Sequence, residues 1–105
     1  MAELRTIIWS ELRYRLTLAL VESGRPMSIP DLLDALASEG LVPAGARPGK
    51  EVSDALRRAR RQGWVVRRSR GVYAAGRVPR SSMHFVRRAL AEIDDWHARQ
   101  PSRAP

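Results

Sequence analysis

The sequence contains no cysteine, which excludes disulfide bonds and any metal site built on thiolates. No apolar run approaches the ~18 residues that a membrane-spanning helix requires, and no basic-then-apolar leader opens the chain. Aromatic residues are few, and they do not form the stacking platform of proteins that bind single-stranded nucleic acid. We therefore expect a soluble, cytoplasmic protein.

Acidic residues are missing from one long part of the chain. Between Ala55 and Ala91 there are eleven arginines and no aspartate or glutamate, so the formal charge of +8 is segregated and not evenly spread. Such a field attracts polyanions, and the planar guanidinium group suits phosphates and guanine edges. A GC-rich genome would also favour arginine over lysine, so the absence of acids is the stronger observation. It predicts a nucleic-acid partner; an acidic protein partner or a role in solubility are the alternatives.

The length of 105 residues fits one domain. We expect this domain to span residues 1–99, with a core over 27–76, terminal helices over 3–22 and 82–99, and a disordered tail over 100–105. Apolar periodicity and the positions of Gly and Pro predict its elements. These are a helix from Glu3 to about Glu22, a very short strand at Met27–Ile29, a helix from Pro30 or Asp31 to Gly40, a loop at Leu41–Gly49, a helix from about Lys50 to Gln62, strands at Trp64–Val66 and Val72–Ala74, and a last helix capped by Ser81 or Ser82.

The stretch from Val52 to Tyr73 is the most specific part of the sequence. On a helical projection its apolar residues gather within about 100° of arc, and basic residues occupy the opposite side. A glycine, Gly63, and a hairpin follow at once. In the winged helix layout a helix of this kind lies in the major groove of DNA, and the hairpin touches the DNA backbone or minor groove.

The segment from about Met27 to Ala75 resembles the winged helix-turn-helix superfamily of bacterial DNA-binding proteins. The matching motifs are Met27-Ser28-Ile29 with Pro30-Asp31-Leu32-Leu33, Val52-Ser53-Asp54-Ala55-Leu56-Arg57-Arg58, Gly63-Trp64-Val65-Val66-Arg67, and Arg70-Gly71-Val72-Tyr73. The chain is also similar to small actinobacterial proteins in which such a module continues into a Ser/Thr-capped helix, here from Ser81 to Arg88. It departs from the usual pattern in its long linker before the third helix, its short wing turn and the lack of a following effector domain.

The resemblance implies that certain residues of the third helix face bases or phosphates: Lys50, Ser53, Asp54, Arg57 and Arg61. Three residues on or beside the wing tip are expected to meet phosphates: Arg67, Arg68 and Arg70. Arg58 and Arg60 lie at the flanks of the helix; of these two, Arg58 is included in the predicted DNA-binding set. Asp54 would either accept a bond from a cytosine amine or stabilise the helix N-terminus.

The last helix and the aromatic residues leave alternatives open. Arg87 and Arg88 either reach flanking DNA backbone or form the polar face of the last helix. Trp64 and Tyr73 are expected in the core, whereas Trp9 and Trp96 suggest a subunit interface.

Catalysis is not expected, and neither a metal nor a cofactor is implied. His84 and His97 are too far apart for the i, i+4 metal arrangement, and Asp94 and Asp95 diverge on a helix. The sequence thus predicts a mostly α protein with a small β-wing, a winged helix-turn-helix with extra terminal helices. We expect it to bind double-stranded DNA in the nucleoid as a homodimer, through its first and last helices, as a repressor or nucleoid-associated protein. A protein–protein interaction module or an RNA-binding protein is the alternative.

Overall fold

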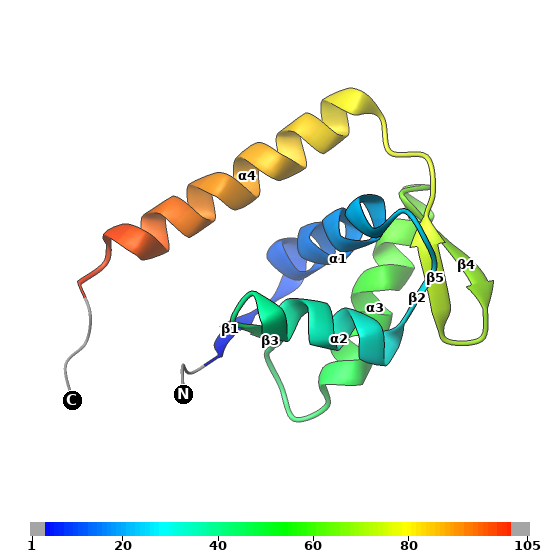
Figure 1. Ribbon diagram of the computed structural model, residues 1–105, viewed down its shortest axis with the longest axis horizontal. Helices are drawn as coiled ribbons and strands as arrows, with labels where there is room; N and C mark the ends of the chain where they lie inside the picture. Colours follow the sequence, from blue (N-terminus) through cyan, green and yellow to red (C-terminus); the bar gives the residue numbers. More distant parts are fainter. Residues whose placement is uncertain (1–3, 102–105) are drawn as a thin grey trace.

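The computed structural model describes residues 4–101, and four helices form most of this part of the chain (Figure 1). Within it, the elements are β1 (Arg5–Ile7), α1 (Trp9–Ser23), β2 (Met27–Ser28), α2 (Ile29–Ser38), β3 (Leu41–Pro43), α3 (Pro48–Arg61), β4 (Val65–Ser69), β5 (Val72–Ala75) and α4 (Arg80–Arg99). The predicted helix start at Glu3 lies outside the described residues, and so do residues 102–105 of the predicted tail.

Helix α1 is the central element, because α2, α3, α4 and β5 all contact it. Three of its leucines, Leu12, Leu16 and Leu20, are almost fully buried among these neighbours. The apolar residues around α1 are therefore covered largely within one chain. They do not by themselves require the homodimer contact that is expected through the first helix.

The prediction of one helix from Glu3 onward was wrong for Arg5–Ile7, which form β1. This strand pairs in parallel with β3, and Arg5 lies opposite Leu41. Trp9 is the first residue of α1, and its φ of 50° lies in the left-handed region, so the helix does not continue toward the N-terminus beyond it. The prediction of a loop over Leu41–Gly49 was wrong at both ends. Leu41–Pro43 form β3, because they pair with β1, which is distant in the sequence, and Pro48 and Gly49 belong to the first turn of α3.

Helix α2 begins at Ile29, one residue before the earliest predicted start at Pro30, and Ser28 is its N-cap. The Ser28 hydroxyl accepts a hydrogen bond from the Asp31 backbone N–H at 3.1 Å, and the Asp31 carboxylate accepts one from the Ser28 backbone N–H at 3.0 Å. This reciprocal capping box satisfies two of the N–H groups that a helix start otherwise leaves unpaired. It also explains why the pKa of Asp31 lies below its ordinary value.

The hairpin β4–β5 is completed by β2 into a three-stranded antiparallel sheet of order β2-β5-β4. Two backbone hydrogen bonds extend the hairpin beyond its strands. The Gly76 N–H donates to the Trp64 carbonyl at 2.7 Å, and the Arg77 N–H donates to the Gly63 carbonyl at 2.9 Å. An ideal Cβ on Gly76 would lie 2.4 Å from the Gly63 oxygen, so only glycine fits there. The sheet is thereby fixed to the end of α3.

Helix α4 packs on α1, on the side of α1 opposite α2 (Figure 1). It begins at Arg80 with Pro79 as its N-cap and without a side-chain cap, so the predicted Ser81 or Ser82 cap was wrong. Val86 and Leu90 are buried, and Met83 and Ile93 pack against the same core. These four residues form an apolar stripe on the last helix, through which a homodimer is expected, and the stripe is covered within the chain.

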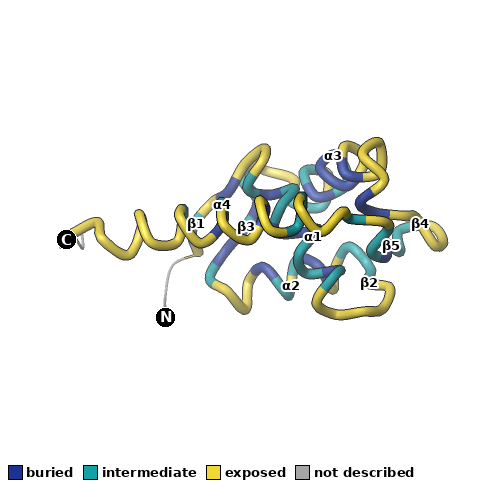
Figure 2. The backbone as a smooth tube through the Cα atoms, turned by 90° about the horizontal axis from the view of Figure 1, so that it is seen from above, coloured by how far each residue is buried: buried dark blue, intermediate teal, exposed yellow. Residues whose placement is uncertain are grey.

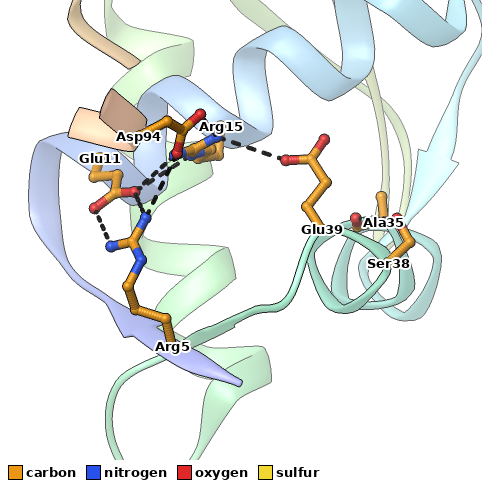
Figure 3. Close-up of polar contacts among 7 residues, drawn as sticks. All are labelled: Arg5, Glu11, Arg15, Ala35, Ser38, Glu39 and Asp94. Carbon is orange, nitrogen blue, oxygen red and sulfur yellow. Dashed lines mark hydrogen bonds and ion pairs between the residues drawn. The ribbon is translucent and has the colours of Figure 1, made fainter. Parts of the chain in front are cut away.

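A cluster of charges that the sequence does not reveal holds α4 and β1 to α1 (Figure 3). Arg15, only 7% exposed, donates to Glu11 at 3.0 Å and to Asp94 of α4 at 2.6 Å, and it lies 3.6 Å from Glu39 at the end of α2. Arg5 of β1 binds the same Glu11 carboxylate through two hydrogen bonds, of 3.1 and 2.8 Å. Four elements meet at this point.

The expected fold class is confirmed: the protein is mostly helical, with four helices and a small antiparallel sheet in residues 4–101. The order α1, β2, α2, α3, β4, β5 is compatible with a winged helix, to which β1, β3 and α4 are added. The long linker before α3 contains β3. We refer to the β4–β5 hairpin as the wing.

Candidate nucleic-acid interface

Helix α3 is buried on one side and basic on the other. Val52 and Leu56 are fully buried, and Ala55 and Ala59 are nearly so, as the helical projection predicts. Arg57 lies on the other side of the helix and is exposed to solvent. Of the predicted site residues on α3, Lys50, Arg57, Arg58 and Arg61 are exposed, and Ser53 and Asp54 are half-buried.

At the N-terminal end of α3, Lys50 and Asp54 form an ion pair with an N–O distance of 2.9 Å. The hydrogen bond from Lys50, followed by the attraction of Arg57 and Arg58, lowers the pKa of Asp54. Asp54 stands in the second turn of the helix, where the dipole effect has faded, and Glu51 is the acid of the first turn. The suggested role for Asp54 at the helix terminus is therefore replaced by pairing with Lys50.

The wing is short and arginine-rich. Its strands turn through Arg70 and Gly71, and the positive φ of 72° at Gly71 favours glycine there. The register slips between Arg67, opposite Tyr73, and Ser69, opposite Val72, which leaves Arg68 outside the regular pairing. All three predicted wing arginines, Arg67, Arg68 and Arg70, are exposed.

A groove joins the basic side of α3 to the wing. It has a volume of about 490 Å³ and lies between the C-terminal half of α3 and β4. Its lining residues are Arg57, Arg60, Arg61, Val65, Val66 and Arg67. The structure thus brings Arg60 to the same surface as the predicted residues. The projection had left Arg60 at the flank of the helix, and its proximity to β4 could have been inferred only from the immediate turn at Gly63.

The arginines of this surface are not neutralised by the protein itself. In residues 4–101, no carboxylate lies within 4.0 Å of the guanidinium groups of Arg57, Arg58, Arg60, Arg61, Arg67, Arg68 or Arg70. Three of the four arginines of α4 differ: Arg87 pairs with Glu22 at 3.4 Å, Arg88 pairs with Glu92 at 3.6 Å, and Arg99 pairs with Asp95, whereas Arg80 has no such partner in the described residues. The unpaired charge is therefore concentrated on α3 and the wing, which we call the basic surface.

The aromatic residues divide into two groups. Trp64 and Tyr73 are buried, as predicted, and Trp64 lies near Tyr14 with a ring-centroid distance of 6.3 Å. Trp9 and Trp96 are 81% and 51% exposed. The buried pair lies at the base of the wing. Of the exposed pair, Trp9 lines a pocket with Asp54 and Arg58 of α3, and Trp96 lies near the C-terminal end of α4.

Comparison with known proteins gives one family match. Residues 32–76 match a family model described as "Transcriptional regulator, AbiEi antitoxin". The match covers less than half of the chain, and it spans most of α2, the whole of α3 and the wing. It fits a helix-turn-helix DNA-binding family, one of transcriptional regulators and not of enzymes. No curated protein and no solved structure matched the sequence significantly.

Within residues 4–101, no group of three or more His, Asp or Glu side chains is arranged to hold a metal ion. No helix within the same residues is long and apolar enough to cross a membrane.

Proposed function

We propose that this protein is a transcriptional regulator that binds double-stranded DNA through its basic surface. The observation that carries the proposal is the continuous run of unpaired guanidinium groups from α3 across the groove to β4. Arginine side chains that lack an internal acidic partner are available to phosphates and base edges. The match to a family of transcriptional regulators supports the same role.

In the proposed complex, α3 lies in the major groove. Arg57 and Arg61 are four residues apart, so both project from one side of the helix, where paired bonds to guanine O6 and N7 are within reach. Lys50, Ser53 and Asp54 lie on the first two turns of the same helix. Asp54, held by Lys50, would accept a bond from a cytosine amine, and Lys50 would screen it from the phosphates.

The flanking arginines position the helix. Arg58 and Arg60 diverge from Arg57 on either side, and Arg60 contributes to the groove. Arg67, Arg68 and Arg70 of the wing would contact the phosphate backbone. The two-residue turn makes the wing short, so backbone contact is favoured over deep insertion into the minor groove.

We also propose that the protein acts as a homodimer in the nucleoid, by occupying its sites as a repressor or as a nucleoid-associated protein. A two-fold dimer would place two copies of α3 in successive major grooves, ~34 Å apart. RNA is a poorer partner for this surface, because the deep and narrow major groove of A-form helices excludes a helix.

The test replaces Arg57 and Arg61 together by alanine. Both side chains are exposed, so folding should be preserved. Affinity for a preferred duplex, selected from genomic fragments, should fall by about 1–3 kcal/mol per arginine, and affinity for random duplex should fall less. The matched control is the pair Arg87→Ala and Arg99→Ala, which removes the same charge from ion pairs on α4 and should change affinity little.

Fluorescence anisotropy with both duplexes measures these losses. Equal losses on the two duplexes would make Arg57 and Arg61 phosphate contacts without base readout. An unchanged affinity in the double variant would overturn the proposed docking through α3.

A further inference from the structure

Helix α4 has a second apolar face that is mostly exposed. Phe85 and Trp96 are 57% and 51% exposed, and the Phe85 ring also contacts Tyr14 of α1 edge to face, with ring centroids 6.0 Å apart. They are eleven residues apart, which is close to three turns, so they lie on one side of the helix. This side is roughly a third of a turn away from the buried residues Val86 and Leu90.

The same face carries an ion pair, Arg88 with Glu92, whose two side chains could instead pair with those of a second copy. Arg88 and Glu92 lie between the two aromatic residues, and their side chains are 73% and 72% exposed. Along the whole helix, the basic residues Arg80, Arg87 and Arg88 precede the acidic residues Glu92, Asp94 and Asp95, and Arg99 follows them. Two such helices packed in opposite directions bring unlike charges together, whereas parallel packing brings like charges together.

The face is held in a fixed position. Val86 and Leu90 anchor α4 in the core, and Asp94 binds the buried Arg15. Beyond this anchor, the C-terminal part of α4 extends past the rest of the molecule, and its residues are exposed (Figure 2). The wing lies at the opposite end of the long axis (Figures 1 and 2). The Trp96 end of the exposed face lies on the extended part of α4, beyond Asp94, whereas its Phe85 end lies on the part that Val86 and Leu90 anchor.

We propose that a second copy of this chain docks antiparallel on the face formed by Phe85, Arg88, Ala89, Glu92 and Trp96, called here the α4 face. A two-fold axis beside Leu90 places Phe85 opposite the partner's Trp96 and Arg88 opposite the partner's Glu92. Ala89 lies near the axis, where its small side chain allows close approach. This inference rests on the proposed homodimer, and it moves the interface away from the stripe of Met83, Val86, Leu90 and Ile93.

The expected dimer is modest in affinity. A 20-residue helix is about 30 Å long, and a contact made mainly by two such helices falls at the lower end of specific interfaces, at about 1,200 Å² or less. We expect a dissociation constant in the micromolar range. A tandem pair of DNA sites would strengthen the association, because it raises the effective concentration of one copy near the other.

Complementary charge reversals test the pairing in the intact protein. Arg88→Glu alone places like charges across the axis, and so does Glu92→Arg alone, so each variant should sediment as a monomer. An equimolar mixture of the two variants should form a heterodimer, since each glutamate at 88 or 92 of one chain then meets an arginine of the other. Mixing cannot repair the pair within one chain, so recovery requires contact between chains.

Aromatic variants provide the second arm. Phe85→Ala with Trp96→Ala should raise the dimer dissociation constant by at least about tenfold. Trp9→Ala, which removes an even more exposed tryptophan from α1, is the matched control and should leave it unchanged. Circular dichroism establishes that each variant is folded.

Three outcomes would overturn the inference: a wild-type monomer up to several hundred micromolar, no heterodimer in the mixture, or dissociation by Trp9→Ala and not by the α4 variants. These measurements are made without DNA. Anisotropy with a single-site duplex then tests the DNA-binding proposal separately, because monomeric variants retain the basic surface and should still bind one site.

Discussion

Arg15 is expected to be the charged residue whose loss most destabilises the fold. It is only 7% exposed and contacts Glu11, Asp94 and Glu39 from three different elements. We propose the substitution Arg15→Met, which retains much of the buried apolar stem and removes the guanidinium group. The change isolates the ionic contacts from the packing of the side chain.

The magnitude follows from what each partner loses. Removing one member of a buried ion pair costs about 3–5 kcal/mol when the remaining charge stays buried and unpaired. Here Asp94 and Glu39 are 58% and 57% exposed and can be hydrated, and Glu11 keeps both hydrogen bonds from Arg5. We therefore expect a smaller loss of about 2 kcal/mol, or a decrease in Tm of about 8–16 °C for a domain of this size.

Urea unfolding followed by far-ultraviolet circular dichroism measures this loss. Arg99→Met is the matched control, because Arg99 is 61% exposed and pairs with Asp95 within the same helix. Exposed pairs of this kind contribute about 0–1 kcal/mol, so the control should remain close to wild type. A loss below about 0.5 kcal/mol in Arg15→Met would refute the structural role that we assign to the cluster.

The pH dependence of the free energy of unfolding is a second measurement that tests Arg15→Met. Burial alone would raise the pKa of Glu11, but the hydrogen bonds and charges of Arg5 and Arg15 outweigh it and hold the pKa below its ordinary value of 4.5. A carboxylate with a lowered pKa in the folded state stabilises the protein above pH 4.5. This contribution is lost as the pH falls through the folded-state value. The loss of stability on acidification should be smaller in Arg15→Met, which removes one of the two guanidinium partners.

Two further predictions concern the wing. Gly76→Ala should lower the free energy of unfolding by about 2 kcal/mol or more, because the added Cβ would lie 2.4 Å from the Gly63 carbonyl oxygen. Gly49→Ala is the control, since the nearest atom to its added Cβ is 3.9 Å away. In the same urea titration this control should be neutral or slightly stabilising. Replacing Arg67, Arg68 and Arg70 together by alanine should make DNA binding less sensitive to salt. The slope of log affinity against log salt concentration should decrease by about 0.9 for each lost phosphate contact, and the preferred sequence should not change. An altered preference in the triple variant would instead indicate that the wing reads bases.

Local signals predicted the parts of the fold that local interactions determine. Pro30 places the start of α2 to within one or two residues, and the alternation of buried and basic positions defines the two sides of α3. Gly63 and the adjacent β-branched residues predict the hairpin. Each of these features depends on residues within a few positions of one another, so the sequence pattern is sufficient to find them.

Features that depend on distant partners were not predictable in this way. The strand β1 exists because Arg5 lies opposite Leu41, and the apolar spacing of Leu4 and Ile8 resembles the start of a helix. Likewise, nothing local distinguishes the buried Arg15 from the solvent-facing arginines. For the candidate site, the exposure of the predicted arginines follows from the pattern of α3, but the inclusion of Arg60 depends on how β4 returns beside the helix.

The central claim is that the basic surface binds duplex DNA, and competition between polyanions tests it most directly. Wild-type protein bound to a labelled genomic duplex is challenged with unlabelled duplex DNA, double-stranded RNA or polyglutamate at several salt concentrations. We predict that duplex DNA displaces the label at the lowest concentration. If two subunits make ~6–10 phosphate contacts, affinity should fall by about 10³–10⁵ between about 50 and 200 mM salt. Stronger displacement by RNA or polyglutamate, or binding that does not depend on salt, would contradict the claim.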